Sequence, residues 1–88
     1  MKKKQIPLES GALNSKSFDL LLSLTSIRSE PLIEALRDYY VNGLTKSEAY
    51  TKHGVDKTIF SRRLPIVQGV FNTVITFNQV YIKSNHTS

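Results

Sequence analysis

Four polar side chains within six residues can all donate hydrogen bonds: Lys57, Thr58, Ser61 and Arg62. In a helix of about 100° per residue they would spread over roughly 140°, which makes one continuous polar face. A guanidinium can give two parallel hydrogen bonds to guanine, a threonine offers a hydroxyl and a methyl group, and an ammonium suits guanine or phosphate. This face is therefore predicted to read a nucleic acid duplex.

A pair of residues that precedes this face in the sequence can add a contact to the phosphate backbone of the duplex. Lys46 and Ser47 are expected in the first turn of a preceding helix, where the lysine ammonium and the backbone amides are placed for a phosphate. Asp56 has the wrong charge for DNA and is interpreted as a helix cap only.

The remaining residues of the same segment are predicted to pack inward. Ile59, Phe60 and Leu64 fall on the side opposite the polar face and are expected to contact the other helices. Arg63 lies among them, so we expect it to lay its stem along apolar surface and to pair with Glu34 or Asp38. A phosphate contact is the alternative for Arg63.

The elements that position these residues can be predicted from capping chemistry. The run Thr45-Lys46-Ser47-Glu48 forms a capping box, which opens a helix of about 45–53. Gly54 ends that helix, and a second helix begins after Asp56 and ends or kinks at Pro65. Residues 45–64 therefore have the layout of a helix-turn-helix.

The rest of the chain is predicted to be helical as well. Helices are expected over about 17–26 and over about 30–42, the latter with Ser29 and Pro31 at its start and Gly43 after its end. For 66–80 a helix is favoured over a β-strand, although the segment is rich in β-branched residues. The expected fold is a small all-α domain of four to five helices over 17–82, with a flexible basic arm (1–16) and a frayed tail (83–88).

Charge and composition limit the function further. The net charge is +5, and residues 44–88 carry six Lys or Arg against two acids, which points to a polyanionic partner. The chain has no cysteine, and we find no spacing typical of a metal site, a phosphate-binding loop or a catalytic nucleophile. No enzyme activity, catalytic residue, metal or cofactor is predicted. Lys2, Lys3 and Lys4 precede Gln5, Pro7 and Glu9 and no apolar stretch, so neither export nor membrane anchoring is expected.

Two resemblances sharpen this interpretation. The run from Gly54 to Arg62 is similar to helix-turn-helix units of bacterial repressors, with two departures. Tyr50 stands where a small residue usually lets the helices approach, and Arg63 stands where an apolar residue is usual. Over about residues 18–75, FDLLLSLTSIRSEPLIEALRDYYVNGLTKSEAYTKHGVDKTIFSRRLPIV resembles the PapB-type regulators of fimbrial adhesin biosynthesis.

The PapB resemblance implies a bacterial, cytoplasmic regulator of a fimbrial operon. It also implies double-stranded, AT-rich, repeated DNA sites bound by several protomers, with a minor-groove preference. A minor-groove contact would fall to Arg62 or to the arm with Lys2–Lys4, whereas the helical wheel alone suggests the major groove.

A protein-interaction module is the rival interpretation. The apolar segment from Val70 to Ile82 could bind a partner protein, with the basic charge serving solubility alone. The same segment could form a homodimer, so the two functions are compatible.

Overall fold

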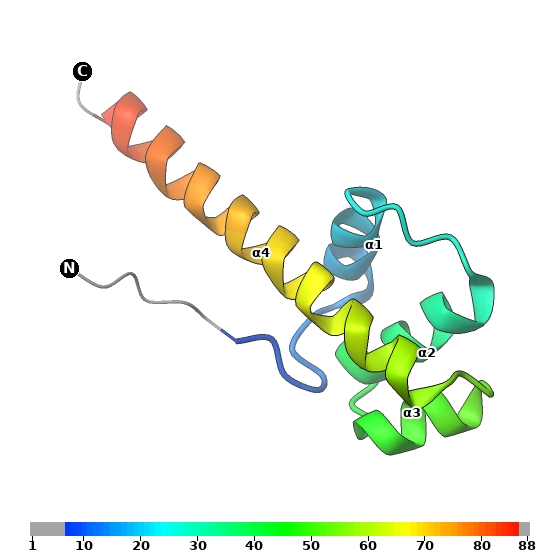
Figure 1. Ribbon diagram of the computed structural model, residues 1–88. Coiled ribbons are helices and arrows are strands. Elements are labelled where there is room, and N and C mark those ends of the chain that lie inside the picture. The colour runs from blue at the N-terminus through cyan, green and yellow to red at the C-terminus, as the bar shows by residue number, and fades with distance from the viewer. Residues whose placement is uncertain (1–6, 87–88) are drawn as a thin grey trace.

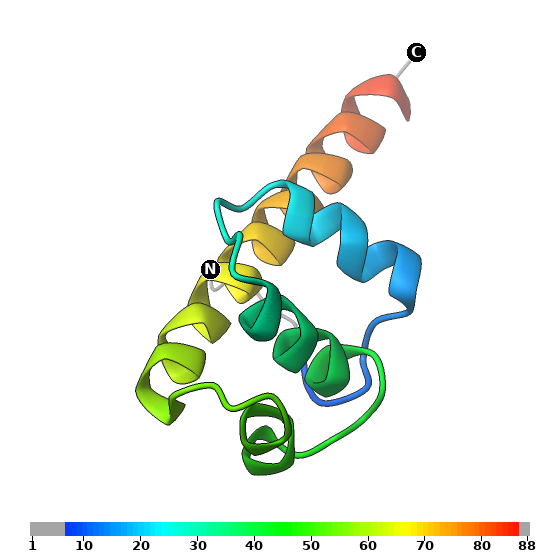
Figure 2. The same cartoon turned by 90° about the vertical axis from the view of Figure 1, so that its right-hand side faces the viewer.

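The computed structural model describes residues 7–86, and for 82–86 only the helical backbone. Four helices follow one another: α1 (Ser15–Ser23), α2 (Glu30–Tyr40), α3 (Lys46–Lys52) and α4 (Lys57–His86). No strand occurs in this range, so the predicted all-α fold is confirmed. The helix α4 forms a long rod, and α1, α2 and α3 gather around its first half (Figures 1 and 2).

Local chemistry explains where the first two helices begin and end. The Asn14 side chain accepts a hydrogen bond from the Ser17 amide at 2.8 Å and caps α1, so the helix starts two residues before the predicted Ser17. Pro31 lies in the first turn of α2, as expected. Gly43 follows α2 with φ +81, a left-handed conformation that suits glycine.

The core lies where α1, α2 and α3 meet the first half of α4. Its largest fully buried side chains are Phe18, Leu36, Tyr40, Phe60 and Val67. An aromatic chain crosses it, because the Tyr39 ring lies 4.9 Å from that of Tyr40 and 6.1 Å from that of Phe60, both edge-on. The core thus ties the start of α4 directly to α2.

The helix favoured for 66–80 is confirmed and the alternative of a strand there is wrong, but Pro65, which was predicted to end or kink the helix, does not end it. Residues 57–86 form one helix with Pro65 inside it. Proline has no amide to donate to the carbonyl of Ser61, and its ring crowds that carbonyl, but the buried Phe60 and Val67 anchor the helix on either side of it. Tertiary packing therefore outweighs the local cost. The same helix runs to His86, so the frayed tail expected from residue 83 is helical up to that point, and residues 87–88 lie outside the described range.

Residues 7–14 differ from the mobile arm that the sequence suggested. The amides of Gly11 and Leu13 donate to the carbonyls of Tyr39 and Tyr40 at 2.8 and 2.9 Å. The Leu8 amide donates to Gln68 Oε1 at 2.7 Å. This segment therefore crosses from α4 to the end of α2, and Lys2–Lys4 of the expected arm lie outside the described residues.

Candidate nucleic-acid interface

The start of α3 has the predicted capping box. The Glu48 amide donates to Thr45 Oγ1 at 3.1 Å, and the Thr45 amide donates to Glu48 Oε1 at 2.9 Å. Two amides that have no partner inside the helix are satisfied in this way. Lys46 and Ser47 therefore occupy the first turn of α3, and both are exposed.

The turn between α3 and α4 is held by backbone hydrogen bonds. The amide of Val55 donates to the Tyr50 carbonyl at 2.8 Å, and that of Gly54 donates to the Thr51 carbonyl at 3.2 Å, which is the Schellman pattern. Gly54 has φ +65, the left-handed conformation that this motif needs. Asp56 then caps α4, since Oδ1 accepts from the Thr58 amide at 2.8 Å and from the Ile59 amide at 3.2 Å. Its predicted role as a cap is confirmed.

The small residue at the contact of α3 with its neighbours is Ala49, one position before the site that the repressor pattern indicated. Ala49 is fully buried. Tyr50 is half-buried at the edge, with its ring 5.7 Å from that of Phe60. The small buried residue of α3 is therefore Ala49, and Tyr50 packs beside it against Phe60.

A buried carboxylate joins α2 to the end of α3. His53 Nε2 lies 2.6 Å from Asp38 Oδ2, Lys52 Nζ lies 3.4 Å from the same oxygen, and Asn42 donates to Oδ1 at 2.7 Å. These contacts lower the pKa of Asp38 to about 2, with the hydrogen bond from His53 as the largest cause, although burial acts in the opposite direction. Sequence analysis missed this role, because Asp38 and His53 lie on different elements.

The polar face predicted on α4 is exposed. Lys57, Thr58, Ser61 and Arg62 are all accessible, while Phe60, between them in sequence, is fully buried.

On the opposite side of α4, the structure corrects the predictions for Ile59 and Arg63. Ile59 was predicted to pack inward but is 46% exposed, because the neighbouring helices lie against the side of α4 that carries Phe60 and Val67.

Arg63 does not form the predicted ion pair. Asp38 is occupied by His53 and Lys52, and Glu34 is an exposed residue. Arg63 is half-buried and lines a hollow of about 400 Å³ beside the link between α1 and α2. Arg28, Ser26 and Ser29 line the same hollow. No local pattern in the sequence connects Arg63 with that link, because they meet only through the packing of α4.

Comparison with known proteins identifies the family. The profile of PapB, described as adhesin biosynthesis transcription regulatory protein, matches residues 1–81. The chain belongs to this family.

Named relatives of the PapB family agree with this assignment. The chain is 42% identical over 65 residues to the F1845 adhesin operon regulatory protein of Escherichia coli, covering 74% of this chain and 76% of that protein. It is 35% identical over 63 residues to the regulatory protein FanB of Escherichia coli, covering 72% of this chain and 64% of FanB. The crystal structure of E. coli FocB superposes with a TM-score of 0.79 at 28% identity, over 85% of each chain.

Membership of the PapB family makes the chain a transcription regulator and not an enzyme. Burial raises the pKa of Tyr39 and of Tyr40 further above physiological pH. In residues 7–86 no three His, Asp or Glu side chains are grouped in a way that could hold a metal ion. None of the described helices is long and apolar enough to cross a membrane.

Proposed function

We propose that α3 and α4 act as a helix-turn-helix that binds double-stranded DNA at the control region of a fimbrial or adhesin operon. The observation that carries this proposal is the exposed set of Lys57, Thr58, Ser61 and Arg62 on a helix whose opposite side is buried. Such a helix is anchored by its apolar side and presents donors to a groove about 12 Å wide. Membership of a family of transcription regulators supports DNA as the partner.

Each residue has a distinct proposed role. Arg62 contacts base edges, and Thr58 and Ser61 add hydroxyl contacts beside it. Lys57, and Lys46 on α3, contact backbone phosphates, with Ser47 next to Lys46. All six side chains are exposed, which is a requirement for these roles.

The resemblance to PapB-type regulators adds three finer features to the proposal. The sites are AT-rich and repeated, several protomers occupy them, and the protein acts in the bacterial cytoplasm. In a minor groove narrowed by AT-rich sequence, the Arg62 guanidinium suits the strong negative potential. Footprinting with reagents specific for one groove distinguishes that mode from major-groove contact.

Salt dependence of duplex binding tests the proposal. A protein that contacts several phosphates loses affinity steeply as salt rises, because bound counterions are released from the DNA. We expect saturable binding to an adhesin-operon fragment with a strongly negative slope of log affinity against log salt. If no duplex is bound at low salt, the rival interpretation of a pure protein-interaction module is favoured.

A substitution at Arg62 tests the assignment of the face. Arg62→Ala is expected to weaken specific binding by about 1–3 kcal/mol, because it removes base contacts. Lys16→Ala is the matched control: it removes one positive charge from an exposed position on α1, away from α3 and the start of α4. Wild-type affinity in a folded Arg62→Ala protein would refute the role of Arg62.

A further inference from the structure

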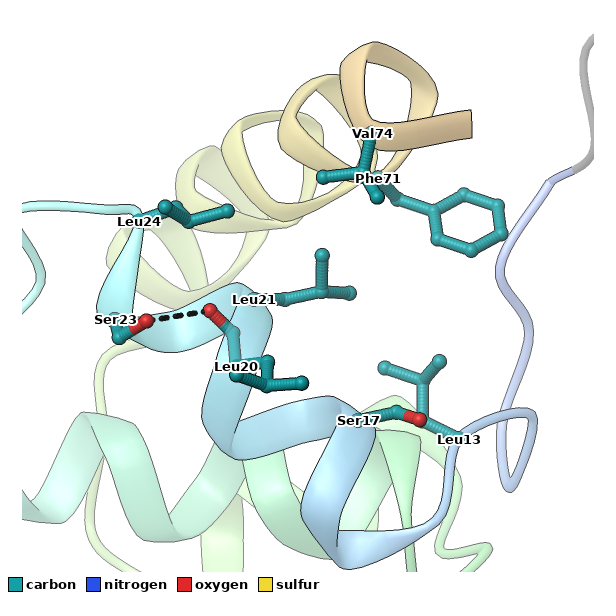
Figure 3. Close-up of a pocket in the computed structure, with 8 residues that line it drawn as sticks. All are labelled: Leu13, Ser17, Leu20, Leu21, Ser23, Leu24, Phe71 and Val74. Atoms are coloured by element: carbon teal, nitrogen blue, oxygen red, sulfur yellow. Dashed lines mark hydrogen bonds between the residues drawn. The ribbon is translucent and has the colours of Figure 1, made fainter. Parts of the chain in front are cut away.

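Two of the hollows on the described surface differ sharply in charge. The cleft between α1 and α4 is lined by four leucines, Phe71, Val74 and two serines, and it has no charged side chain (Figure 3). The hollow beside the link between α1 and α2 has a volume of about 400 Å³, and two arginines, Arg28 and Arg63, line it. This second hollow is called the arginine hollow below.

The two guanidiniums of the arginine hollow have no negative partner among the described residues. No carboxylate there forms an ion pair with Arg28 or Arg63, and the carboxylates of Asp19 and Asp38 are paired with other basic side chains. Glu30, the acid nearest to Arg28 in sequence, is exposed and does not line the hollow. Since arginine stays charged in proteins, the hollow presents two positive charges that no ion pair in the described part of the chain neutralises.

Backbone contacts hold one of the two arginines in place. Arg28 Nη1 donates to the carbonyl of Thr25 at 3.1 Å and to the carbonyl of Ile27 at 2.8 Å. These bonds fix the guanidinium against the link between α1 and α2, and they leave the donors on Nη2 and Nε for another acceptor. A side chain that is already held loses less conformational entropy when it binds a ligand.

The other donors come from a different helix and from the link itself. Arg63 lies on α4 and is half-buried, and the exposed Ser26 and Ser29 line the same hollow. Ser29 is the N-cap residue of α2, but its side chain makes no capping hydrogen bond. Its hydroxyl can therefore donate to a ligand. Two guanidiniums and two hydroxyls thus surround one concave space.

This set of donors suits a phosphoryl group. A guanidinium gives two parallel hydrogen bonds to a phosphate or a carboxylate, and several such donors match the three terminal oxygens of a phosphoryl group better than the two oxygens of a carboxylate. The volume of about 400 Å³ lies within the range of about 300–1,000 Å³ that is usual for small-molecule sites. A phosphate alone would fill only a small part of it, so the ligand is expected to have a further part.

Apolar side chains line the rest of the arginine hollow. Ile27 and Leu32 are 6% and 5% exposed, whereas Ile66 on α4 is 42% exposed. A flat or apolar group can pack on Ile66 and on the planar guanidinium of Arg63, because guanidiniums also stack on aromatic rings. The remainder of the ligand is therefore expected to be apolar or aromatic.

We propose that the arginine hollow binds a small phosphorylated molecule, with its phosphate between Arg28 and Arg63 and its aromatic or apolar part against Ile66. A nucleoside monophosphate has this combination of groups. The site is separate from the polar face of α4, because none of the four residues of that face lines the hollow. A bound ligand connects α4 with the link between α1 and α2.

The consequence for DNA binding rests on the proposed function. Arg63 directly follows Arg62, so a phosphate at Arg63 brings negative charge close to the polar face of α4. The positive potential that attracts DNA falls, and the affinity for a duplex should decrease about twofold to fivefold. Since both ligands bind at the same time, this decrease should level off once the arginine hollow is saturated.

Titration in the absence of DNA tests the site directly. Inorganic phosphate and adenosine monophosphate, added to the full chain at constant ionic strength, should shift the Nε–H NMR signals of Arg28 and Arg63 along saturable curves. The signals of Arg37 and Arg62 serve as internal controls. Adenosine monophosphate should bind roughly threefold or more tightly than inorganic phosphate, because only it can also contact Ile66. Curves that do not saturate, or equal shifts at all four arginines, would overturn the proposal.

A carboxylate placed in the arginine hollow should compete with the ligand. Ile66→Asp should weaken binding of adenosine monophosphate about tenfold, because its charge pairs with the guanidiniums and repels phosphate. Ile59→Asp is the matched control, with the same change at a residue on the same helix that is 46% exposed and does not line the hollow. Circular dichroism checks that both variants are folded. Equal affinities of the two variants for adenosine monophosphate would refute the site.

A conservative change at Arg63 provides a second variant. Arg63→Lys keeps the positive charge and most of the apolar stem, but an ammonium cannot give two parallel hydrogen bonds to phosphate. Binding of adenosine monophosphate should weaken roughly threefold or more. Wild-type affinity of a folded Arg63→Lys protein would contradict the role of the guanidinium.

Competition with a duplex separates a small ligand from a phosphate of the DNA backbone. Adenosine monophosphate should still bind to protein that is saturated with duplex. If it displaced the duplex without limit, a DNA phosphate would be the occupant of the arginine hollow, and the proposal would be overturned. Binding of adenosine monophosphate by a chain that binds no duplex would refute the proposed function and leave this site in place. A chain that binds duplex and neither probe would do the reverse.

Discussion

The buried carboxylate of Asp38 should control how firmly α3 and the turn before α4 are held. Its pKa falls from the ordinary 3.8 to about 2 in the fold, chiefly through the hydrogen bond from His53. At 1.36 kcal/mol for each unit, this shift is worth about 2 kcal/mol of folding free energy, and solvent screening in a domain this small reduces the expected effect to about 1–2 kcal/mol. Asp38→Asn removes the charge and should lower the free energy of unfolding at pH 7 by that amount.

The pH dependence gives the effect a distinct signature. Because the pKa of Asp38 is lower in the folded state than in the unfolded state, its contribution is complete above the unfolded value. It is lost as the pH falls from about 5 towards about 2. Urea unfolding followed by circular dichroism across this range should show a shallower loss of stability for Asp38→Asn than for the wild type.

A matched carboxylate on the same helix serves as the control for Asp38. Glu34→Gln removes a charge from an exposed position one turn earlier on α2, and its effect should stay within about 0.5 kcal/mol. An Asp38→Asn protein that is as stable as the wild type at pH 7, or that loses stability with the same slope in acid, would refute the reasoning.

Two further substitutions test the elements around the candidate interface. Gly54→Ala should lower the free energy of unfolding by about 1–2 kcal/mol in urea titrations, because φ +65 is strained for a residue with a Cβ. The added Cβ would meet nothing within 4 Å, so no steric clash should add to this loss. A much larger loss would contradict this reasoning. Arg63→Ala should lower the melting temperature, because packing at the link between α1 and α2 is lost. Its affinity for the duplex should stay within about twofold of the wild type. A stable Arg63→Ala variant that fails to bind DNA would show that Arg63, and not Arg62, makes the DNA contact.

Local chemistry in the sequence was sufficient to predict most helix boundaries around the candidate interface. The capping box at Thr45 and Glu48, the left-handed Gly54 and the Asp56 cap each act over a few residues, so their effect can be derived without knowledge of the rest of the fold. The exposure of Lys57, Thr58, Ser61 and Arg62 follows from helical periodicity in the same way.

Only the tertiary structure decided which local preferences would be overridden. Pro65 disfavours a continuous helix locally, but Phe60 and Val67 are buried on either side of it, and their packing keeps α4 in one piece. The contact of Asp38 with His53 joins residues 15 positions apart, and the contact of Leu8 with Gln68 joins residues 60 apart. Such pairs form only when the helices are in place, because no periodicity or capping rule within one element determines which surface another element will cover.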